Sequence, residues 1–225
     1  MNNAWFVTGT DTEVGKTLVT CALLHAVQAR GRRAIGMKPI AAGCDAHGRN
    51  EDVEAICAAS HPAADRRLIN PYLLQAAVAP HIAARAEGID IATETIMTSF
   101  RQLAALAEVV VVEGVGGFRV PLNDRQDSAD LAVALDLPVI LVIGLRLGCL
   151  NHALLTVEAI AARGLQLAGW VANQIDPRMP HLPENLQALQ QRIPAPLLGH
   201  IPRLAAPTAE RAASHLQLDD ARLLP

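Results

Sequence analysis

The stretch that decides the fold is Gly9-Thr10-Asp11-Thr12-Glu13-Val14-Gly15-Lys16-Thr17. It follows the apolar run Trp5–Thr8 and opens an Ala/Leu-rich run of helical character. A loop between a strand and a helix that ends in Gly-Lys-Thr is typical of a phosphate-binding loop. Its first glycine comes one residue earlier than in the common spacing, so the loop is one residue longer than usual. The sequence therefore predicts binding of Mg·ATP or a closely related nucleotide.

The residue types of this loop suit phosphate chemistry. Backbone N–H groups around Gly15 can face phosphate oxygens, and the helix N-terminus adds a positive dipole. Lys16 would neutralise the β- and γ-phosphates, and Thr17 would offer its hydroxyl to Mg²⁺. The alternative is an ordinary turn that contains glycine, but the strand–loop–helix context favours phosphate binding.

The composition suits a globular α/β protein and excludes several other classes. The chain has 225 residues, of which 51% are hydrophobic, 18% charged and 3% aromatic. The core must therefore consist of Ala, Val, Ile and Leu, as in buried parallel sheets. A net charge of −3 gives no basic excess that would indicate a nucleic-acid partner.

Cysteine spacing and hydropathy indicate the cellular setting. No two of the four cysteines have C-x-x-C spacing, so neither a zinc site nor a redox pair is indicated. The chain has no run of 18 apolar residues and no basic and apolar leader at its start, so no membrane partner is expected. We expect a cytoplasmic protein.

Short β-branched runs alternate with longer Ala/Leu-rich runs along the chain. This alternation predicts a phosphate-loop NTPase-like α/β fold, with a mainly parallel sheet and helices on both faces, in a single ATP-binding domain over residues 1–225. The predicted strands are Trp5–Thr8, Ala34–Met37, Val109–Val112, Val139–Ile143, Trp170–Asn173 and Leu197–Ile201. The predicted helices are Lys16–Arg30, Asp52–Ala59, Ala79–Glu87, Ile91–Ala107, Asp127–Ala134, Asn151–Arg163 and Glu184–Arg192.

Two charged residues follow predicted strands, at the edge where such sheets bind ligands. Glu113 follows Val109–Val112, where a phosphate-loop protein holds Mg²⁺, usually through Asp. Lys38 follows Ala34–Met37 and can stabilise a transferring phosphoryl group. The alternatives are a solvated strand end for Glu113 and a surface lysine for Lys38. Asp52 begins a predicted helix, where the residues alone favour a cap or dipole partner.

Taken together, these segments resemble the dethiobiotin synthetase family, the ATP-dependent carboxylases of biotin synthesis. The resemblance covers nearly the whole chain, and the longer phosphate loop looks like this family's own form. The matching segments are Phe6–Thr17, Gly36–Pro39, Val112–Gly117, Leu147–Ala153, Ala168–Asn173 and Ile193–Gly199.

The resemblance implies a ligase that uses ATP and Mg²⁺. An amine of 7,8-diaminononanoate would take up CO2 to give a carbamate. The CO2 can be added to the reaction directly or as bicarbonate. ATP would phosphorylate the carbamate, and the second amine would close the cyclic urea of dethiobiotin. The family resemblance also implies a homodimer with the active site at the subunit interface.

The resemblance further implies roles for individual residues. Those implied in catalysis are Lys38, Thr12 and Lys16. Those implied to surround Mg²⁺ are Thr17, Asp52 and Glu113, which replaces the capping role of Asp52. Those implied to contact the nucleotide are Glu13, Val14, Gly15, Lys16, Thr17, Leu18, Asp52, Glu113, Gly114, Val115, Gly116, Asn173, Gln174, Pro202, Arg203, Leu204 and Glu210. Those implied to contact the substrate are Ala42, Gly148, Cys149 and Asn151, the last three from the neighbouring subunit.

Two positions depart from the family pattern and leave alternatives open. Ala42 occupies a position where the family usually offers a hydroxyl, and Gln174 one where an acid is frequent. The loss of the hydroxyl keeps open a related amide-forming ligase that acts on another substrate. A nucleotide switch of the partitioning or septum-positioning type is a third hypothesis. Such proteins usually carry an extra lysine early in the loop, and this loop has none before Gly15.

Overall fold

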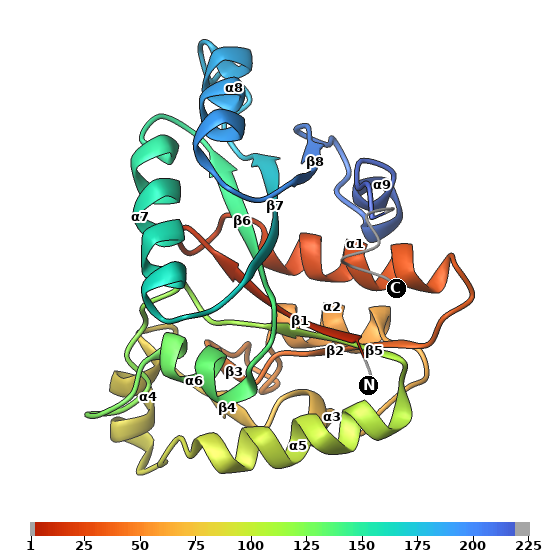
Figure 1. Ribbon diagram of the computed structural model, residues 1–225. Coiled ribbons are helices and arrows are strands. Elements are labelled where there is room, and N and C mark those ends of the chain that lie inside the picture. The colour runs from red at the N-terminus through yellow and green to blue at the C-terminus, as the bar shows by residue number, and fades with distance from the viewer. Residues whose placement is uncertain (1–2, 219–225) are drawn as a thin grey trace.

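The computed structural model describes residues 3–218, and its main feature is a parallel sheet of six strands (Figure 1). The strands are β1 (Asn3–Gly9), β2 (Ala34–Met37), β5 (Val109–Glu113), β6 (Val139–Leu145), β7 (Leu167–Gln174) and β8 (Leu197–Ile201). They lie in the order β2-β5-β1-β6-β7-β8, and each neighbouring pair is parallel.

Helices connect most of these strands. Those in the described part of the chain are α1 (Lys16–Gln28), α2 (Glu51–Ala59), α3 (Arg66–Ile69), α4 (Pro80–Glu87), α5 (Thr93–Leu106), α6 (Ser128–Leu135), α7 (Cys149–Ala162), α8 (Leu182–Arg192) and α9 (Ala209–Ala213). Two short strands, β3 (Ile40–Ala42) and β4 (Tyr72–Leu74), form a separate parallel pair. Within residues 3–218, no helix combines the length and apolar character needed to cross a membrane.

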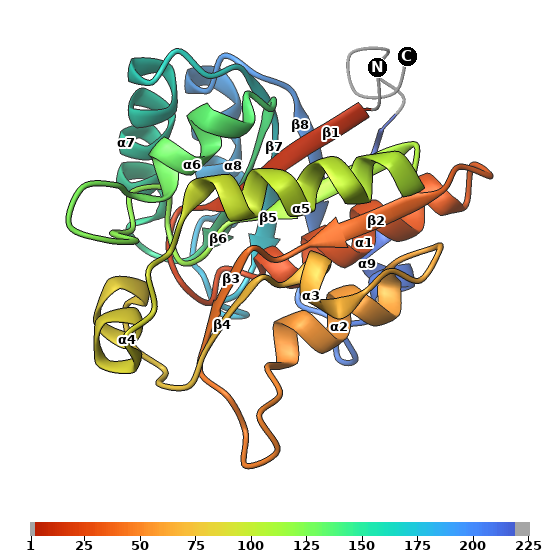
Figure 2. The same ribbon diagram turned by 90° about the horizontal axis from the view of Figure 1, so that it is seen from below.

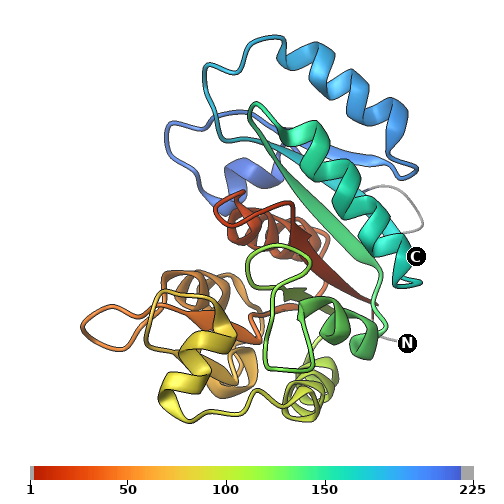
Figure 3. The same ribbon diagram turned by 90° about the vertical axis from the view of Figure 1, so that its left-hand side faces the viewer.

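The sheet is buried on both faces, which explains why its strands are almost continuously apolar. Successive side chains of a strand point to opposite faces, so Trp5 and Val7 of β1 pack in the cluster that holds α1 and α9. Phe6, between them, packs in the cluster that holds α5 and α6. Figure 2 shows α5 across the face of the sheet opposite α1, and Figure 3 shows α7 and α8 side by side.

The predicted fold class is confirmed, and each predicted strand and helix is present. Boundaries differ by a few residues; α7, for example, begins at Cys149 where the sequence predicted Asn151. The elements that the sequence did not predict are β3, β4, α3 and α9. Each has only three to five residues, too few for a hydrophobic period to be recognised.

The carboxyl ends of the strands meet at one edge of the sheet. β1 and β5 are in register there, with Val7 beside Glu113, and β2 ends next to them with Met37 beside Val112. The phosphate loop follows β1, and Lys38 follows β2. The parallel register therefore brings together charged residues that are far apart in the sequence.

Candidate functional site

The loop between β1 and α1 has the backbone conformation that an anion site needs. Gly15 caps α1 in the left-handed region, with φ of 89°, and no side chain caps the helix. The N–H groups of the first turn thus remain available for an anion. A Cβ at Gly15 would lie 2.2 Å from Asn173 Nδ2, so only glycine fits.

Lys16 is a buried cation without a carboxylate partner. Only 6% of the residue is exposed, and its Nζ donates a hydrogen bond to the Asp11 carbonyl at 2.9 Å. Among residues 3–218, no ion pair includes Lys16. Burial, followed by repulsion from Lys38, lowers its pKa from 10.5 to about 8. A cation in such a position favours an incoming anion.

Lys38 stands between two carboxylates. Its Nζ lies 2.5 Å from Glu113 Oε1 and 3.2 Å from Asp52 Oδ2. Lys38 is 3% exposed and Glu113 is fully buried, which excludes both the surface lysine and the solvated strand end. Thr17 Oγ1 lies 2.7 Å from the Asp52 carboxylate and 2.9 Å from that of Glu113. Its single hydrogen can serve one of them at a time.

The charge states of this cluster follow from its geometry. Burial alone would lower the pKa of Lys38, but the negative charges of Glu113 and Asp52 outweigh burial and raise it. Burial likewise tends to raise the pKa of Asp52, but the charge of Lys38, the hydrogen bonds from Thr17 and Lys38 and the charge of Lys16 together outweigh burial and lower it. Lys38 is therefore protonated at neutral pH, and Asp52 is ionised.

Two asparagines that sequence reasoning missed hold this cluster in place. Asn70 Nδ2 donates to the Lys38 carbonyl at 2.6 Å, which fixes the backbone after β2. Asn50 caps α2 by accepting from the Val53 N–H, and its own amide donates to the Gly43 carbonyl at 2.8 Å. The cap of α2 was recognisable, because Asn stands directly before two acids. The hydrogen bond from Asn70 joins residues 32 positions apart, so no pattern in the sequence near Asn70 indicates it.

The oxygen atoms of the cluster fit Mg²⁺. Thr17, Asp52 and Glu113 supply one hydroxyl and two carboxylates, and buried Glu113 Oε2 has no hydrogen-bond partner. Magnesium is usually bound through one or two protein carboxylates, with phosphate and water oxygens completing its shell. In the part of the chain that the structure describes, no group of three or more His, Cys, Asp or Glu suited to a metal is found. A metal here would accordingly need ligands from a bound nucleotide.

A cavity of about 1040 Å³ lies beside the phosphate loop, among α1, α2 and the segment that leads from β8 into α9. It is large enough for a ligand of nucleotide size. Asn173 closes one side, at the end of β7, where its Nδ2 donates to the Val14 carbonyl at 2.9 Å. The predicted nucleotide residues that line the cavity are Glu13, Gly15, Thr17, Leu18, Asp52, Asn173, Gln174, Pro202, Arg203, Leu204 and Glu210.

A smaller cavity of about 330 Å³ lies on the other side of the phosphate loop. Glu13, Gly15, Thr17 and Asp52 line both cavities, so the two adjoin at the loop. The other predicted site residues around the smaller cavity are Thr12, Lys16, Lys38, Ala42, Val115 and Gly116. The arrangement gives a nucleotide-sized cavity that adjoins a second compartment at Thr17, with Lys16 in the wall of the second.

The predicted substrate segment after β6 lies apart from both cavities. Gly148 caps α7 with φ of 93° and no side chain caps the helix, so the first-turn N–H groups after Cys149, whose own N–H donates to the Arg146 carbonyl, remain available to an anion. Neither Gly148, Cys149 nor Asn151 lines either cavity. Cys149 is buried, whereas Leu147 before it is 88% exposed. Within one chain, then, these three residues contribute to neither cavity.

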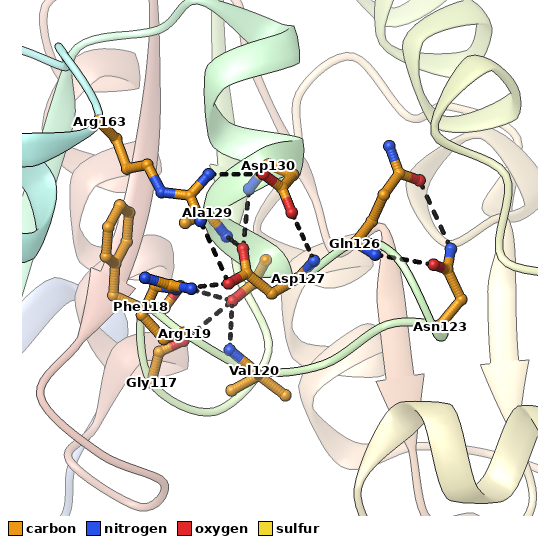
Figure 4. Close-up of polar contacts among 11 residues, drawn as sticks. Gly117, Phe118, Arg119, Val120, Asn123, Gln126, Asp127, Ala129, Asp130 and Arg163 are labelled. Atoms are coloured by element: carbon orange, nitrogen blue, oxygen red, sulfur yellow. Dashed lines mark hydrogen bonds and ion pairs between the residues drawn. The ribbon is translucent and has the colours of Figure 1, made fainter.

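The segment that carries Val115 and Gly116 is fastened where it enters α6 (Figure 4). Asp127 caps α6 by accepting from two backbone N–H groups, and the Asp130 carboxylate accepts from the Asp127 N–H. Arg163, the residue that follows α7, pairs with Asp130 at 2.6 Å and with Asp127 at 3.5 Å. The capping box fixes the start of α6, and the ion pairs of Arg163 tie it to the end of α7.

Ser128 and Arg119 add further contacts to the segment between Gly116 and α6 (Figure 4). Ser128 Oγ donates to the Phe118 carbonyl at 2.6 Å and accepts from the Val120 N–H at 2.9 Å. Arg119 forms an ion pair with Asp127. One wall of the smaller cavity is therefore held by contacts outside that cavity.

Comparison with known proteins agrees with this geometry. A family model described as an AAA domain matches residues 3–211. The chain is 59% identical over 220 residues to the ATP-dependent dethiobiotin synthetase BioD of Aromatoleum aromaticum, covering 96% of this chain and 97% of that one. It is 56% identical to the protein of the same name from Xylella fastidiosa strain 9a5c, covering 90% of this chain and 91% of that one.

Solved structures resemble the fold at much lower sequence identity. A ParA family ATPase from Chlorobium tepidum superposes with a TM-score of 0.58 at 12% identity, covering 96% of this chain and 91% of that one. A MinC:MinD cell division complex from Aquifex aeolicus gives 0.57 at 13% identity, covering 94% and 85%. At such identities the likeness concerns the fold alone.

Proposed function

The chain belongs to the ATP-dependent dethiobiotin synthetase family, and on this premise we propose that it closes 7,8-diaminononanoate to dethiobiotin with CO2 and ATP. The observation that carries the proposal is the buried Lys38 ammonium in the wall of the second compartment, where it pairs with Asp52, a residue that lines both cavities. The reaction needs a cation in that compartment, because negative charge passes there from the nucleotide to the acceptor.

The reaction has three steps. An amine of the substrate attacks CO2 and loses a proton, which gives a carbamate. A carbamate oxygen takes the γ-phosphoryl group from ATP and releases ADP. The second amine then attacks the carbonyl carbon and loses a proton, and the C–O bond to phosphate breaks as the urea ring closes. Overall, ATP becomes ADP and phosphate, and CO2 becomes the urea carbonyl.

Lys38 acts in this scheme as a fixed positive charge. Since Glu113 and Asp52 raise its pKa, it keeps its proton at neutral pH and is unsuited to act as a base. Its ammonium stabilises the carbamate and the charge that develops on the transferring phosphoryl group. The proposal is supported by its place in the wall of the smaller cavity, beside Lys16 and Thr12.

Lys16 and Thr12 hold the γ-phosphate. Lys16 Nζ donates to the Asp11 backbone carbonyl, and a phosphate oxygen in that place would give the buried ammonium a stronger, charge-assisted hydrogen bond. Mg²⁺ bound by Thr17, Asp52 and Glu113 would neutralise charge on the β- and γ-phosphates. The residues of the larger cavity, Asn173, Gln174, Pro202–Leu204 and Glu210 among them, would hold the base and ribose.

A second copy of the chain would complete the substrate compartment. The N-terminus of α7, with Gly148, Cys149 and Asn151, suits a carboxylate but lies away from both cavities of its own chain. Leu147 and Leu155 expose 88% and 57% of their surface on this stretch, as is common for residues that a partner covers. A homodimer in which each α7 receives the partner's substrate carboxylate accounts for both features.

A related ligase with another substrate is the second candidate, and Ala42 favours it. Ala42 lines the smaller cavity, where it offers a methyl group and no hydroxyl to a substrate. Both candidates release phosphate from ATP, so only the acceptor distinguishes them.

Phosphate release that depends on the diamine tests the proposed function. Purified protein with Mg·ATP and bicarbonate should release phosphate when 7,8-diaminononanoate is added, and mass spectrometry should find dethiobiotin in equal amount. A monoamine of the same length is the control, because it can form a carbamate but cannot close the ring. Folded protein that gives no dethiobiotin, or releases phosphate only with another acceptor, contradicts the proposal. Turnover without any protein partner also counts against a nucleotide switch.

A further inference from the structure

Asp11 places a negative charge within the loop that must receive a polyanion. Its Oδ1 accepts from the Thr12 N–H at 2.7 Å, and its backbone carbonyl accepts from Lys16 Nζ at 2.9 Å. The remaining carboxylate oxygen, Oδ2, accepts from Arg146 Nη2 at 2.6 Å. Asp11 thus contacts two residues proposed for the γ-phosphate and one arginine from elsewhere in the fold.

Arg146 reaches the phosphate loop from the neighbouring strand. It follows β6, which pairs with β1, and its carbonyl accepts from the Cys149 N–H at the start of α7. The ion pair with Asp11 spans 135 residues and joins the loops that follow these two strands. About half of each side chain is buried, at 43% and 46% exposure, so the pair contributes little to stability.

We propose that Arg146 is a positioning residue for the phosphate loop. Its positive charge offsets the negative charge of Asp11, so that the loop can bind the phosphates of ATP. The proposal rests on the proposed ATP site. Without Arg146, the phosphate loop would carry the negative charge of Asp11, next to Thr12, with no cation paired to it. This negative charge would also act more strongly on the Lys16 ammonium, which already binds the Asp11 backbone carbonyl and is attracted by the charge of the Asp11 side chain.

This interpretation predicts an unusual pattern in a double-mutant cycle. Arg146→Gln should weaken binding of a fluorescent N-methylanthraniloyl ATP in the presence of Mg²⁺ by roughly three- to tenfold. Adding Asp11→Asn to that variant should restore affinity to within roughly twofold of the wild type, because the charge that needed compensation is gone. Arg146→Lys, which keeps the positive charge, should bind the probe almost as well as the wild type.

The matched control is the ion pair of Arg101 with Glu94 on α5, which is also exposed but lies away from both cavities. Arg101→Gln should leave probe affinity unchanged. Circular dichroism checks that each variant is folded, and Arg146→Met, which also removes the charge and should weaken binding to the same extent, serves if Arg146→Gln is not.

Three results would overturn the proposal. The first is Arg146→Gln with wild-type affinity for the probe, and the second is a double variant as weak as Arg146→Gln. The third is an Arg146→Gln variant whose KM rises for the diamine alone, which would make Arg146 a substrate contact. If the wild type fails to bind the probe, the proposed ATP site fails with it; failure of the diamine reaction alone leaves this test intact.

Discussion

Replacing Lys38 by methionine is expected to lower kcat by roughly 10²–10³-fold, the usual loss when one fixed charge that stabilises a transition state is removed. The change removes the ammonium from the wall of the smaller cavity and leaves a side chain of similar length. Affinity for Mg·ATP should fall much less, because Lys16 and the backbone of the phosphate loop remain. Steady-state kinetics together with nucleotide titration separates the two effects.

The same substitution should also destabilise the ligand-free protein, because it leaves the carboxylate of Glu113 buried without its cation. Removing one partner of a buried ion pair lowers the free energy of unfolding by about 3–5 kcal/mol. Changing Glu113 to glutamine in the Lys38→Met background should restore most of the free energy of unfolding but none of the turnover. Urea unfolding measures the first quantity and phosphate release the second. A Lys38→Met enzyme with wild-type kcat would remove Lys38 from the mechanism.

Replacing Lys16 by methionine is expected to have the opposite effect on stability and an equally large effect on activity. Lys16 is buried without a carboxylate, and its pKa is lowered from 10.5 to about 8. At pH 7 it is charged in both the folded and the unfolded chain, so the folded state bears the full cost of that shift. Lys16→Met should therefore raise the free energy of unfolding by roughly 1–3 kcal/mol, after allowance for one lost hydrogen bond.

The stability gained by this variant should depend on pH with a definite sign. A lysine whose folded-state pKa is lowered destabilises the fold most at pH values below the lowered pKa. The cost then disappears as the pH rises from about 8 toward 10.5, because the folded chain releases the proton first. The advantage of Lys16→Met should thus shrink over that range. Loss of stability at pH 7, or retained ATP binding, would contradict the assignment of Lys16 as a cation held ready for phosphate.

The sequence allowed the sheet and the residues at its edge to be predicted, because both depend on local signals. Buried parallel strands read as apolar runs, and a charged residue at the end of such a run stands out, as Lys38 and Glu113 do. The strand–loop–helix context was sufficient to recognise the phosphate loop. Parallel register then brings these groups together without any further signal in the sequence.

Contacts between distant segments could not be predicted from the residues alone. Asp52 reads as a helix cap from its neighbours, and only the fold places its carboxylate 3.2 Å from Lys38. Asn70 and the ion pair between Asp11 and Arg146 depend likewise on tertiary structure. The strands β3 and β4 were missed because three residues are too few to show a period, yet Ala42 at the end of β3 lines the smaller cavity.

The path of one oxygen atom tests most directly the claim that the site activates a carbamate. In the proposed reaction, the oxygen that bridges carbon and phosphorus comes from CO2 and leaves with phosphate when the ring closes. Bicarbonate fully labelled with ¹⁸O, supplied to the enzyme with Mg·ATP and the diamine in a single rapid turnover, should give phosphate that carries one ¹⁸O atom. Dethiobiotin formed with unlabelled phosphate would contradict phosphorylation of a carbamate oxygen.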